Sequence, residues 1–334
     1  HPRYEMRKIN QIESELLPKL KELVNYAQSK DVEITIDAEE QDRLSLSLHI
    51  IEKLAYEKNI RDWPGFGIAL QAYGKRSFDV IHWLNGILDK RDGVHLRLVK
   101  GAYWDYEIKH AQVSGYEGYP VFSKKSLTDI AYLACAKEIF KNKKIFPKFA
   151  THNAHTISSI HHIGKDFNYE FQRLYGMGEL LYKSASEVLG IKNNPSVYAP
   201  IGSYKDLLPY LVRRLLENGA NSSFINRLLD PDTNSEWLAE NPYIRVKSEK
   251  KEIPLPNQIF INRQNSSGMD ISESENLENL KNRLIDFDYK LIDAKSIYEG
   301  REEDNKNVEK IFSISSKKEI GTVVFDNPKN IKQL

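Results

Sequence analysis

The fold class is decided by the stretch Arg97-Leu98-Val99-Lys100-Gly101-Ala102-Tyr103-Trp104-Asp105. Its apolar residues predict a short strand, and Gly101 allows a sharp turn where that strand ends. Arg97 and Lys100 carry positive charge where a buried strand ordinarily carries Val or Ile, and burying a cation is costly unless an anion pairs with it. We expect the aromatic residues from Tyr103 to Tyr106 to form a loop. A charged strand end followed by an aromatic loop is typical of the mouth of a parallel α/β enzyme. The alternative is an ion-paired strand end with a packed loop.

The composition of the chain excludes several classes of protein. Its 334 residues suffice for one large domain or two ordinary ones. The formal net charge is only +1 with 28% charged residues, so no nucleic-acid-binding surface is indicated. No apolar run approaches the roughly 20 residues of a membrane span. No signal peptide opens the chain.

The single cysteine, Cys135, excludes an internal disulfide and fits a reducing, cytoplasmic compartment. It lies among Leu and Ala residues in a helical pattern, where we expect a core thiol and not a nucleophile. The chain begins at His1 and not at a methionine, so we expect that preceding residues have been removed or lost.

A unit of short strand, loop and helix repeats along the chain. Residues 7–30 carry apolar positions three or four apart, which predicts an amphipathic helix. Strands are then expected to end near Asp37, Ala72, Lys100, Thr151, Leu174, Pro200 and Ile225. Helical patterns lie between them at about 41–57, 77–90, 126–142, 155–164, 178–188 and 205–218. Strands that alternate with helices predict a parallel sheet.

Two ways of arranging a parallel sheet compete. An open doubly wound sheet usually has a glycine-rich phosphate loop after its first strand, whereas the acidic stretch Asp37-Ala38-Glu39-Glu40 has no glycine. A (β/α)8 barrel instead gathers polar residues at many strand ends around one mouth. Such strand-end residues are Asp37, Gln71, Lys100, His152, Asn153, Arg173 and Tyr198. They favour an α/β fold of the distorted (β/α)8, TIM-like barrel type. Seven strands are predicted, and the first strand of the barrel is expected to precede His1.

The sequence changes character after about residue 230. Residues 231–275 hold four prolines among many Asn and Ser residues, which predicts a linker. Apolar residues then follow at 3-4-3-4 spacing over 277–291 and predict one helix with a narrow apolar seam. A strand pair is expected around 311–314 and 320–325, followed by the start of a further helix. Residues 276–334 therefore look like the opening of another domain.

Two catalytic alternatives arise from the strand ends. His152 and His155 are spaced like part of a metal site, but a hydrolytic centre also needs carboxylates from other strands, and Asp37 is the only clear one. We therefore expect no metal, and a polar lining that hydrogen-bonds a planar ligand. Lys100 is a candidate Schiff-base lysine, although its neighbours do not provide an obvious apolar or cationic setting to activate the amine.

The helix predicted over 205–218 carries a polar stripe. Tyr210, Arg214 and Glu217 lie three or four residues apart, and Arg213 lies four before Glu217. Adjacent arginines repel each other unless an anion lies between them, and two guanidinium groups suit a carboxylate. The alternative is a solvated pair of Arg213 with Glu217, which contributes little to stability.

Six stretches are similar, in the same order, to the proline dehydrogenase domain of bifunctional proline-utilisation flavoenzymes. They are residues 97–105, 117–120, 149–155, 176–179, 198–202 and 211–224. The resemblance runs from His1 to about residue 230 and continues through Pro254-Leu255-Pro256. It implies a distorted barrel that holds FAD noncovalently at its strand ends and oxidises L-proline to Δ1-pyrroline-5-carboxylate. It also implies that the electrons pass to a membrane quinone, which requires peripheral contact with the inner membrane.

The resemblance also implies roles for individual residues. Arg213 and Arg214 are similar to the pair that binds the proline carboxylate. The residues that resemble the walls of the proline pocket and the flavin edge are Asp37, Tyr103, Leu174, Tyr198 and Tyr210. The residues that resemble FAD contacts are Gln71, Arg97, Val99, Lys100, Gly101, Ala102, Ser123, Lys124, Lys125, Thr151, His152, Asn153 and Glu217. Hydride leaves the ring carbon next to nitrogen for flavin N5, so the task of the pocket is positioning and no nucleophile is needed.

The chain departs from the family pattern at both ends. The family's first strand, with a lysine that helps hold the substrate carboxylate, would lie before His1. Residues from about Ile311 resemble the start of an aldehyde dehydrogenase domain, whose nicotinamide site and catalytic cysteine are not in this sequence. The resemblance therefore implies a fragment whose partners include the other N-terminal and C-terminal portions of the same enzyme. The alternatives are an inactive or complementation-dependent fragment, and an unrelated barrel enzyme that uses a metal or Lys100.

Overall fold

The computed structural model describes residues 3–219, 240–249, 253–285, 291–298, 300–302 and 307–325. The chain divides into two compact units, His1–Asn276 and Leu277–Leu334. The first unit contains the parallel sheet and its helices, and each unit is described by itself below.

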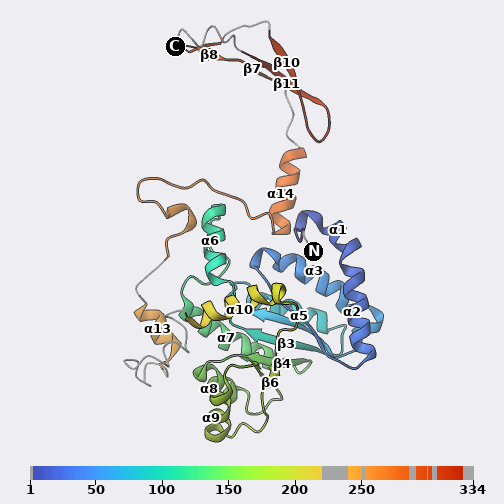
Figure 1. Cartoon of the computed structure of the whole chain (residues 1–334), viewed down its shortest axis with the longest axis vertical. Coiled ribbons are helices and arrows are strands. Elements are labelled where there is room, and N and C mark those ends of the chain that lie inside the picture. Colours follow the sequence, from blue (N-terminus) through green and yellow to red (C-terminus); the bar gives the residue numbers. More distant parts are fainter. Residues whose placement is uncertain are drawn as a thin grey trace. The chain divides into compact units, whose positions relative to one another are not determined.

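A curled, six-stranded sheet forms the centre of the first unit (Figure 1). The strands lie in chain order, and each pairs in parallel with the next. They are β1 (Ile34–Ile36), β2 (Phe66–Gln71), β3 (Val94–Val99), β4 (Ile145–Ala150), β5 (Glu170–Leu174) and β6 (Ser196–Tyr198). The parallel sheet predicted from the repeating unit is therefore confirmed. The seventh strand, predicted to end near Ile225, lies outside the described residues, so the closed eight-stranded barrel stays a prediction.

Helices follow the strands as the sequence pattern predicts. The helices after β1 to β6 are α3 (Leu44–Ala55), α5 (Ser77–Leu88), α7 (Lys125–Phe140), α8 (Ala154–Ile163), α9 (Glu179–Leu189) and α10 (Tyr204–Gly219). Shorter segments are η2 (Gln41–Arg43) and α4 (Lys58–Arg61). The predicted helix over residues 7–30 is divided into η1 (Met6–Lys8), α1 (Ile9–Glu15) and α2 (Leu17–Ser29). The division falls at Leu16, just before Pro18, whose position in the first turn of α2 suits a residue without an N–H group.

One helix differs from the prediction. The expected aromatic loop is wrong beyond Tyr103, because α6 (Trp104–Ser114) begins directly after it. Asp105 and Glu107 lie in the first turn of α6, where negative charge is favourable. The helix ends at Gly115, which adopts a left-handed φ of 66°. The aromatic and acidic residues from Trp104 to Glu107 therefore form the first turn of a helix and not a loop.

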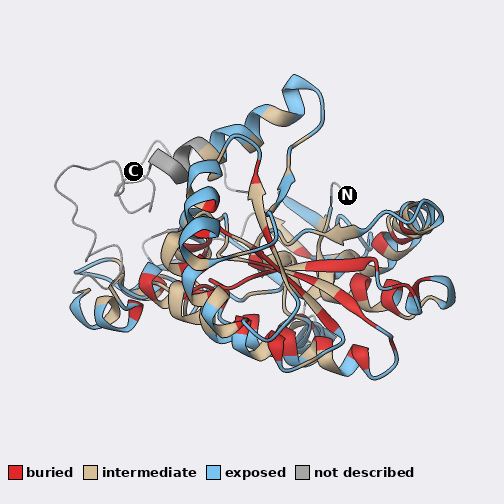
Figure 2. Ribbon diagram, turned by 90° about the horizontal axis from the view of Figure 1, so that it is seen from below, coloured by how far each residue is buried: buried red, intermediate tan, exposed pale blue. Residues whose placement is uncertain are grey.

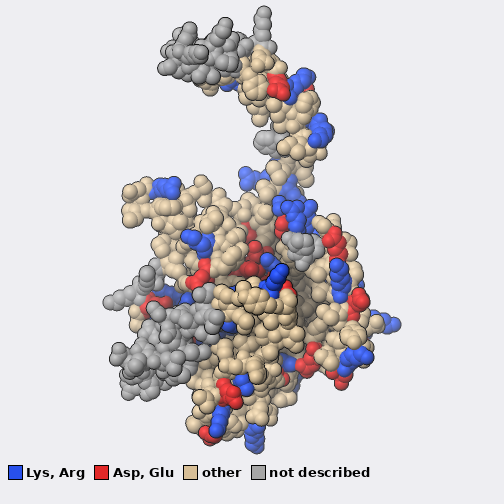
Figure 3. Space-filling view, viewed as in Figure 1, with Lys and Arg blue, Asp and Glu red and all other residues tan. Residues whose placement is uncertain are grey.

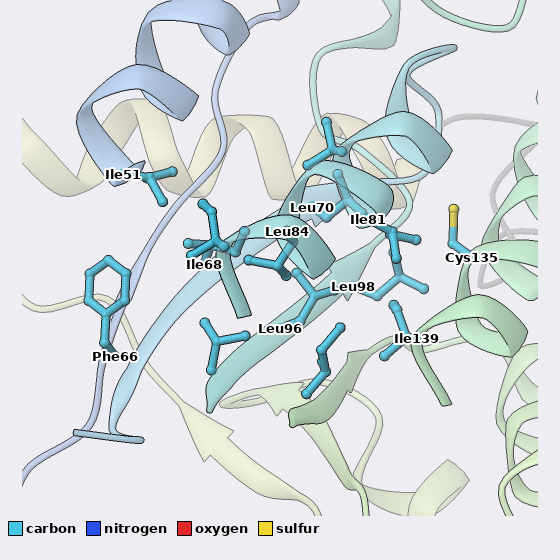
Figure 4. Packing of buried hydrophobic residues seen from close by; sticks show 14 of the residues in the cluster. Ile51, Phe66, Ile68, Leu70, Ile81, Leu84, Leu96, Leu98, Cys135 and Ile139 are labelled. Carbon is cyan, nitrogen blue, oxygen red and sulfur yellow. The ribbon is translucent and has the colours of Figure 1, made fainter. Parts of the chain in front are cut away.

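The core lies between the outer face of the sheet and the helices. Along β3, Val94, Leu96 and Leu98 are buried, whereas the alternate residues are partly exposed. Leu96 and Leu98 pack in one cluster with residues of α5 and α7, as Figure 4 shows for Leu84 and Ile139. Figure 2 shows the same segregation for the other strands, with buried residues concentrated along the sheet and on the helix faces next to it. The opposite face of β3 carries His95 and Arg97, which are partly exposed.

Residues 240–276 belong to the same compact unit as the sheet. The helix α13 (Pro242–Ser248) packs against α7, and Ser126 Oγ donates a hydrogen bond to the Glu249 carboxylate. Further along, Tyr119 Oη donates to the Pro254 carbonyl at 2.6 Å, and Arg76 forms an ion pair with Glu273 at 2.5 Å. Several polar contacts therefore hold this stretch, which the sequence predicts to be a linker, on the first unit.

The second unit is small and consists mostly of strands. A three-stranded sheet has the order β10-β11-β7, with β7 (Ile292–Ala294), β10 (Val308–Phe312) and β11 (Glu319–Val324). The strands β8 (Ile297–Tyr298) and β9 (Arg301–Glu302) form a separate pair, and α14 (Ser274–Ile285) spans the boundary between the units. The strand pair predicted near residues 311–314 and 320–325 is confirmed, and the two strands are antiparallel, although the first ends at Phe312. The helix predicted after Asn327 lies outside the described residues. Within the described ranges, no helix is both long and apolar enough to cross a membrane.

Candidate active site

The carboxyl ends of the six parallel strands lie along one edge of the sheet, and the polar residues predicted there are brought together. Arg97 projects from the inner face of β3 and forms an ion pair with Asp37, which directly follows β1. The anion that a buried strand cation requires is therefore Asp37. The Arg97 side chain is only 17% exposed, and its Nε has no hydrogen-bond partner among the described residues.

Lys100, one residue beyond β3, is also paired. Its ammonium group contacts the carboxylate of Asp129 on α7. An amine that attacks a carbonyl needs a free lone pair, whereas this ion pair involves the protonated amine. The geometry therefore favours Lys100 as a fixed positive charge at the strand end over the Schiff-base alternative.

Gln71 connects the loops that follow the first three strands. This residue ends β2 and is 4% exposed. Its Oε1 accepts a hydrogen bond from the Ala102 N–H at 3.2 Å, and its Nε2 donates to the Glu39 carbonyl at 2.6 Å. A buried amide that uses both its donor and its acceptor in this way fixes the spacing of the two loops.

Gly101 forms the turn at the end of β3, as the sequence predicts. Its φ of 136° is one that residues with a side chain rarely adopt, and an added Cβ would lie 2.5 Å from the ring of Tyr73. Gly101 is therefore closely packed in the segment that joins β3, which ends at Val99, to Ala102 and Tyr103. Glycine is therefore required at position 101 for two reasons, the backbone conformation and the contact with Tyr73.

The stretch Thr151-His152-Asn153 follows β4, and each residue has a defined local role. Asn153 is the N-cap of α8, and its Oδ1 accepts from the Thr156 N–H at 2.9 Å. Thr151 Oγ1 accepts from the Asn153 N–H at 3.2 Å. His152 Nε2 accepts from the Leu174 N–H at 3.2 Å, so this nitrogen carries no proton. Burial and the nearby Arg173 and Arg214 lower the pKa of His152, which keeps the ring neutral.

The same geometry bears on the metal alternative. His152 uses Nε2 to bind the backbone of β5 and so holds the ends of β4 and β5 together. Within the part of the chain that the structure describes, no group of three or more His, Cys, Asp or Glu residues is arranged to hold a metal ion.

Burial raises the pKa of the Cys135 thiol, and Cys135 lies in the core, as expected.

The arginine pair of α10 lies close to two of the predicted aromatic residues. The Arg213 guanidinium is 5.7 Å from the ring centre of Tyr103, and the Arg214 guanidinium is 4.8 Å from that of Tyr210. The contact with Tyr103 connects α10 to the loop after β3, and burial raises the pKa of the Tyr103 hydroxyl. Cations against aromatic rings are held in place without losing their hydrogen-bond donors.

The remaining predicted residues fall into three groups. Leu174 is buried at the end of β5, and Tyr198 is partly buried at the end of β6. Ser123 and Lys124 directly precede α7, and Lys125 begins it, with its ammonium 4.7 Å from the ring centre of Trp104. Lys125 therefore lies beside the start of α6, next to Ser123 and Lys124 in the sequence. The side chain of Glu217 lies outside the described residues.

Two residues at this edge were missed by the sequence analysis. Tyr73 is 1% exposed and contacts Gly101, and Glu107 is 2% exposed on α6. Burial raises the pKa of Glu107 to about 7. Glu107 and Ala111 are four residues apart and both buried, a spacing that places them on one helix face. A helix prediction for residues 104–114 would have placed Glu107 on that face.

The surface of the first unit carries both signs of charge. Figure 3 shows Lys, Arg, Asp and Glu residues interspersed over the visible face. This distribution agrees with a net charge of only +1 and offers no extended basic surface on this face.

Comparisons with known proteins agree on one family. The family described as proline dehydrogenase matches residues 3–227. The chain is 42% identical over 319 residues to the bifunctional protein PutA of Salmonella typhimurium, which covers 90% of this chain and 24% of that protein. It is 43% identical over 305 residues to the PutA protein of Escherichia coli, covering 85% of this chain and 23% of that protein. The chain thus spans about a quarter of the length of these relatives.

A solved structure shows the same fold. A variant of proline utilization A from Bradyrhizobium japonicum superposes with a TM-score of 0.82 at 41% identity. The match covers 86% of this chain and 30% of that one. The curled sheet with its surrounding helices is therefore the fold of this part of the proline utilization proteins.

Proposed function

The chain belongs to the proline dehydrogenase family, and we propose that it carries out the reaction named by that family, the oxidation of L-proline. The product that we propose is Δ1-pyrroline-5-carboxylate, and the cofactor is FAD. The observation that carries the proposal is the arrangement at the strand ends. There, Arg97 pairs with Asp37, and the α10 arginine pair lies against Tyr103 and Tyr210.

The arginine pair supports a substrate that carries a carboxylate. Two adjacent guanidinium groups repel each other, and a bound carboxylate removes this repulsion while it accepts several charge-assisted hydrogen bonds. Arg213 and Arg214 are the residues that we propose for this task. Tyr198, Tyr210 and Leu174 would form the walls that hold the proline ring flat. Binding in one orientation is the main contribution of such a pocket, because the reaction requires no nucleophile from the protein.

The strand-end residues fit a flavin dinucleotide. The buried Arg97 Nε lacks a hydrogen-bond partner among the described residues, and a flavin ring would supply an acceptor for it. The residues that would hold the cofactor are Gln71, Arg97, Val99, Lys100, Gly101, Ala102, Ser123, Lys124, Lys125, Thr151, His152, Asn153 and Glu217. When bound, FAD supplies the acceptor at N5 for the hydride from the ring carbon next to the proline nitrogen, and a quinone reoxidises it.

The protein's own residues would prepare the substrate. Asp37 and Tyr103 would lie beside the proposed pocket, and the ion pair with Arg97 holds the Asp37 carboxylate in place. The fixed charges of Arg97 and Lys100 would favour negative charge on the flavin side of the site. We further propose that the quinone is reached by peripheral contact with the inner membrane, from a cytoplasmic location.

The experiment that tests the function is the visible spectrum of the purified chain before and after anaerobic addition of L-proline. We expect a flavin band near about 450 nm that bleaches with L-proline. D-proline is the matched control, because its carboxylate lies on the opposite face of the ring. The same pocket cannot hold this carboxylate and also present the ring carbon next to nitrogen in the same orientation. A flavin band that L-proline leaves oxidised would contradict the proposed activity.

The second candidate is a fragment that binds flavin only with other portions of the same enzyme. It is favoured by the edges of the sheet, because β1 and β6 each pair on one side only among the described strands. This candidate predicts a colourless protein in solution that gains the flavin band when the other portions of the enzyme are added. The same spectrum therefore separates the two candidates.

A further inference from the structure

A buried carboxylate outside the proposed substrate and cofactor contacts joins three of the strand-end segments. Glu107 lies in the first turn of α6 and is 2% exposed. Its Oε1 accepts a hydrogen bond from the Gln41 backbone N–H at 2.7 Å and another from Tyr73 Oη at 3.3 Å. Gln41 follows β1, Tyr73 follows β2, and Glu107 itself follows β3. One oxygen atom therefore holds together the segments after three neighbouring strands.

Tyr73 carries this connection to the turn at the end of β3. Its ring lies so close to Gly101 that an added Cβ would be 2.5 Å from the ring. Its backbone N–H donates to the Lys100 carbonyl at 2.8 Å, and its carbonyl accepts from the Phe122 N–H at 2.9 Å. These two bonds fix the backbone of Tyr73, and the hydrogen bond from its hydroxyl to Glu107 fixes the other end of the side chain. The ring of Tyr73 thus packs against the Gly101 turn on the side where a Cβ atom would lie.

Gln41 carries the connection to the loop after β1. It begins η2, four residues after Asp37, whose carboxylate pairs with Arg97. Gln71 binds the same loop at the Glu39 carbonyl. Glu107 and Gln71 thus brace the loop after β1 and the loop after β3 at two separate points.

Packing alone does not account for a glutamate at this position. Glu107 lies beside Ile108 and Ala111, which are buried in a small apolar cluster with Tyr73. Burying a carboxylate there is costly, and an apolar side chain would fill the space without that cost. The carboxylate is accounted for by the two donors that converge on it from different loops.

We propose that Glu107 is a positioning residue for proline oxidation, and that its carboxylate sets the spacing between the loop after β1 and the Gly101 turn after β3. The inference rests on the proposed function, because these two segments carry Asp37 and the residues proposed to line the flavin. Glu107 acts through Gln41 and Tyr73 and is not assigned a contact with substrate or cofactor.

The first test needs no bound cofactor. Amide hydrogen exchange is compared between the unaltered chain and the variants Glu107→Leu, Glu107→Gln and Tyr73→Phe. Glu107→Leu is expected to accelerate exchange about tenfold in residues 38–43 and 100–104, and to leave residues 126–140 unchanged. Glu107→Gln keeps an oxygen acceptor for both donors and is expected to restore most of the protection. Asp105→Asn, which neutralises an exposed carboxylate on the same helix, is the matched control and should change neither segment.

The second test uses the flavin-loaded chain. Glu107→Leu is expected to lower kcat with L-proline about tenfold with KM changed less than threefold, because the displaced loops alter the geometry of the reaction more than carboxylate binding. The shape of the visible flavin band should change in the same variant. Glu107→Gln should retain kcat within about threefold, and Tyr73→Phe should show a smaller loss than Glu107→Leu.

Each outcome decides the inference. Unchanged exchange in residues 38–43 and 100–104 of Glu107→Leu would overturn it, with or without flavin. If Glu107→Leu does not fold, Tyr73→Phe is the variant that tests the inference. It must remain folded and exchange faster in residues 100–104, and unchanged exchange there would contradict the inference. If L-proline does not reduce the flavin bound to the unaltered chain, the proposed function is contradicted. The positioning role is not, because the exchange test is independent of flavin.

Discussion

Arg213 and Arg214 are neighbours in the sequence but differ in their surroundings. Arg213 is exposed near the ring of Tyr103, whereas Arg214 is partly buried near Tyr210. A charge that is less solvated interacts more strongly with a bound anion, because water screens it less. We therefore expect Arg214 to contribute more than Arg213 to the binding of the substrate carboxylate.

Replacing Arg214 with Met should raise the KM for L-proline about 10- to 100-fold, because a hydrogen bond to a charged group contributes about 1.5–3 kcal/mol. Arg213→Met should raise it less. Steady-state kinetics measure the effect, and the visible absorbance of each variant reports its flavin content. Lys205→Met removes an exposed charge from the same helix and should leave KM unchanged. A fully flavin-loaded Arg214→Met variant with unaltered KM would refute the assignment.

Glu107 gives the stability of the chain a pH dependence of defined sign. Burial raises the pKa of Glu107 from 4.5 to about 7, and the charges of Asp42 and Glu40 act in the same direction. Hydrogen bonds from Gln41 and Tyr73 oppose this shift. Between these two pH values the folded state holds a proton that the unfolded state has released. The free energy of unfolding therefore falls as the pH rises through this window, and the stabilisation is lost above about pH 7.

The measurement is denaturant unfolding at pH 5 and pH 8 for the unaltered chain and for Glu107→Gln. A shift of this size corresponds to about 3 kcal/mol over the whole window, at 1.36 kcal/mol per pKa unit. The unaltered chain should lose about 2–3 kcal/mol more than Glu107→Gln between the two pH values. Asp105→Asn should behave like the unaltered chain. Parallel pH profiles for Glu107→Gln and the unaltered chain would show that this carboxyl group titrates normally.

At the residue scale, the sequence shows which charged residues are unusual for their position, but it does not show which residues they contact in the fold. Arg97 and Lys100 were found because a strand with cations is unusual, and the structure provides Asp37 and Asp129 as their anions. Glu107 was not found, because glutamate is ordinary in a helix and its burial depends on segments that follow other strands. The role of such a residue is a property of tertiary contacts, which local patterns do not contain.

Glycines in two elements should respond oppositely to the same substitution. Gly101→Ala places a Cβ 2.5 Å from Tyr73 at a φ of 136°, and the two costs together should destabilise the fold by about 2 kcal/mol or more. Gly86 lies inside α5, where an added Cβ meets nothing within 4 Å. Gly86→Ala should therefore stabilise the fold by about 0.5–1 kcal/mol. Thermal unfolding of both variants measures the difference, and a stable Gly101→Ala variant would show that the turn can rearrange.

Strands and helices were predictable here to different degrees. The strand β3 alternates between buried and partly exposed residues, so its register follows from the positions of Leu96 and Leu98. The helix α6 was missed because its first turn is aromatic and acidic, without the apolar spacing that marks the other helices. Its first turn carries the acidic residues Asp105 and Glu107, a composition typical of a helix N-terminus, and Gly115 marks its end. Signals at the helix ends would have identified this element, which periodicity did not.

At the scale of the whole molecule, the order of the sheet followed from the repeating unit, but the packing of residues 253–276 did not. Their prolines and polar residues predict a linker, and only contacts distant in the sequence hold them on the first unit. These contacts include the Tyr119 bond to Pro254, the Gly268 N–H bond to the Gly115 carbonyl at 2.8 Å, and the pair of Arg76 with Glu273. Ile253 also packs on the apolar cluster that contains Tyr73.

Two truncations test whether this stretch is part of the folded unit. A chain that ends after Asn276 keeps all of these contacts and loses only the second compact unit. Its main unfolding transition and its flavin binding should match those of the full chain. A chain that ends after Glu249 loses the contacts of residues 253–276, which together contribute about 3 kcal/mol. Its Tm should fall by about 6–12 °C.

The shorter chain should also bind flavin less tightly, because the lost contacts hold the loop before Val121 and the end of α6, which share a cluster with Tyr73. Tyr119→Phe in the full chain removes only the bond to Pro254 and should lower the unfolding free energy by about 1 kcal/mol. Equal Tm values for the two truncated chains would mean that residues 253–276 behave as a linker, as their composition predicts. A Tm loss confined to the shorter chain would instead place the end of the flavin-binding unit after these residues.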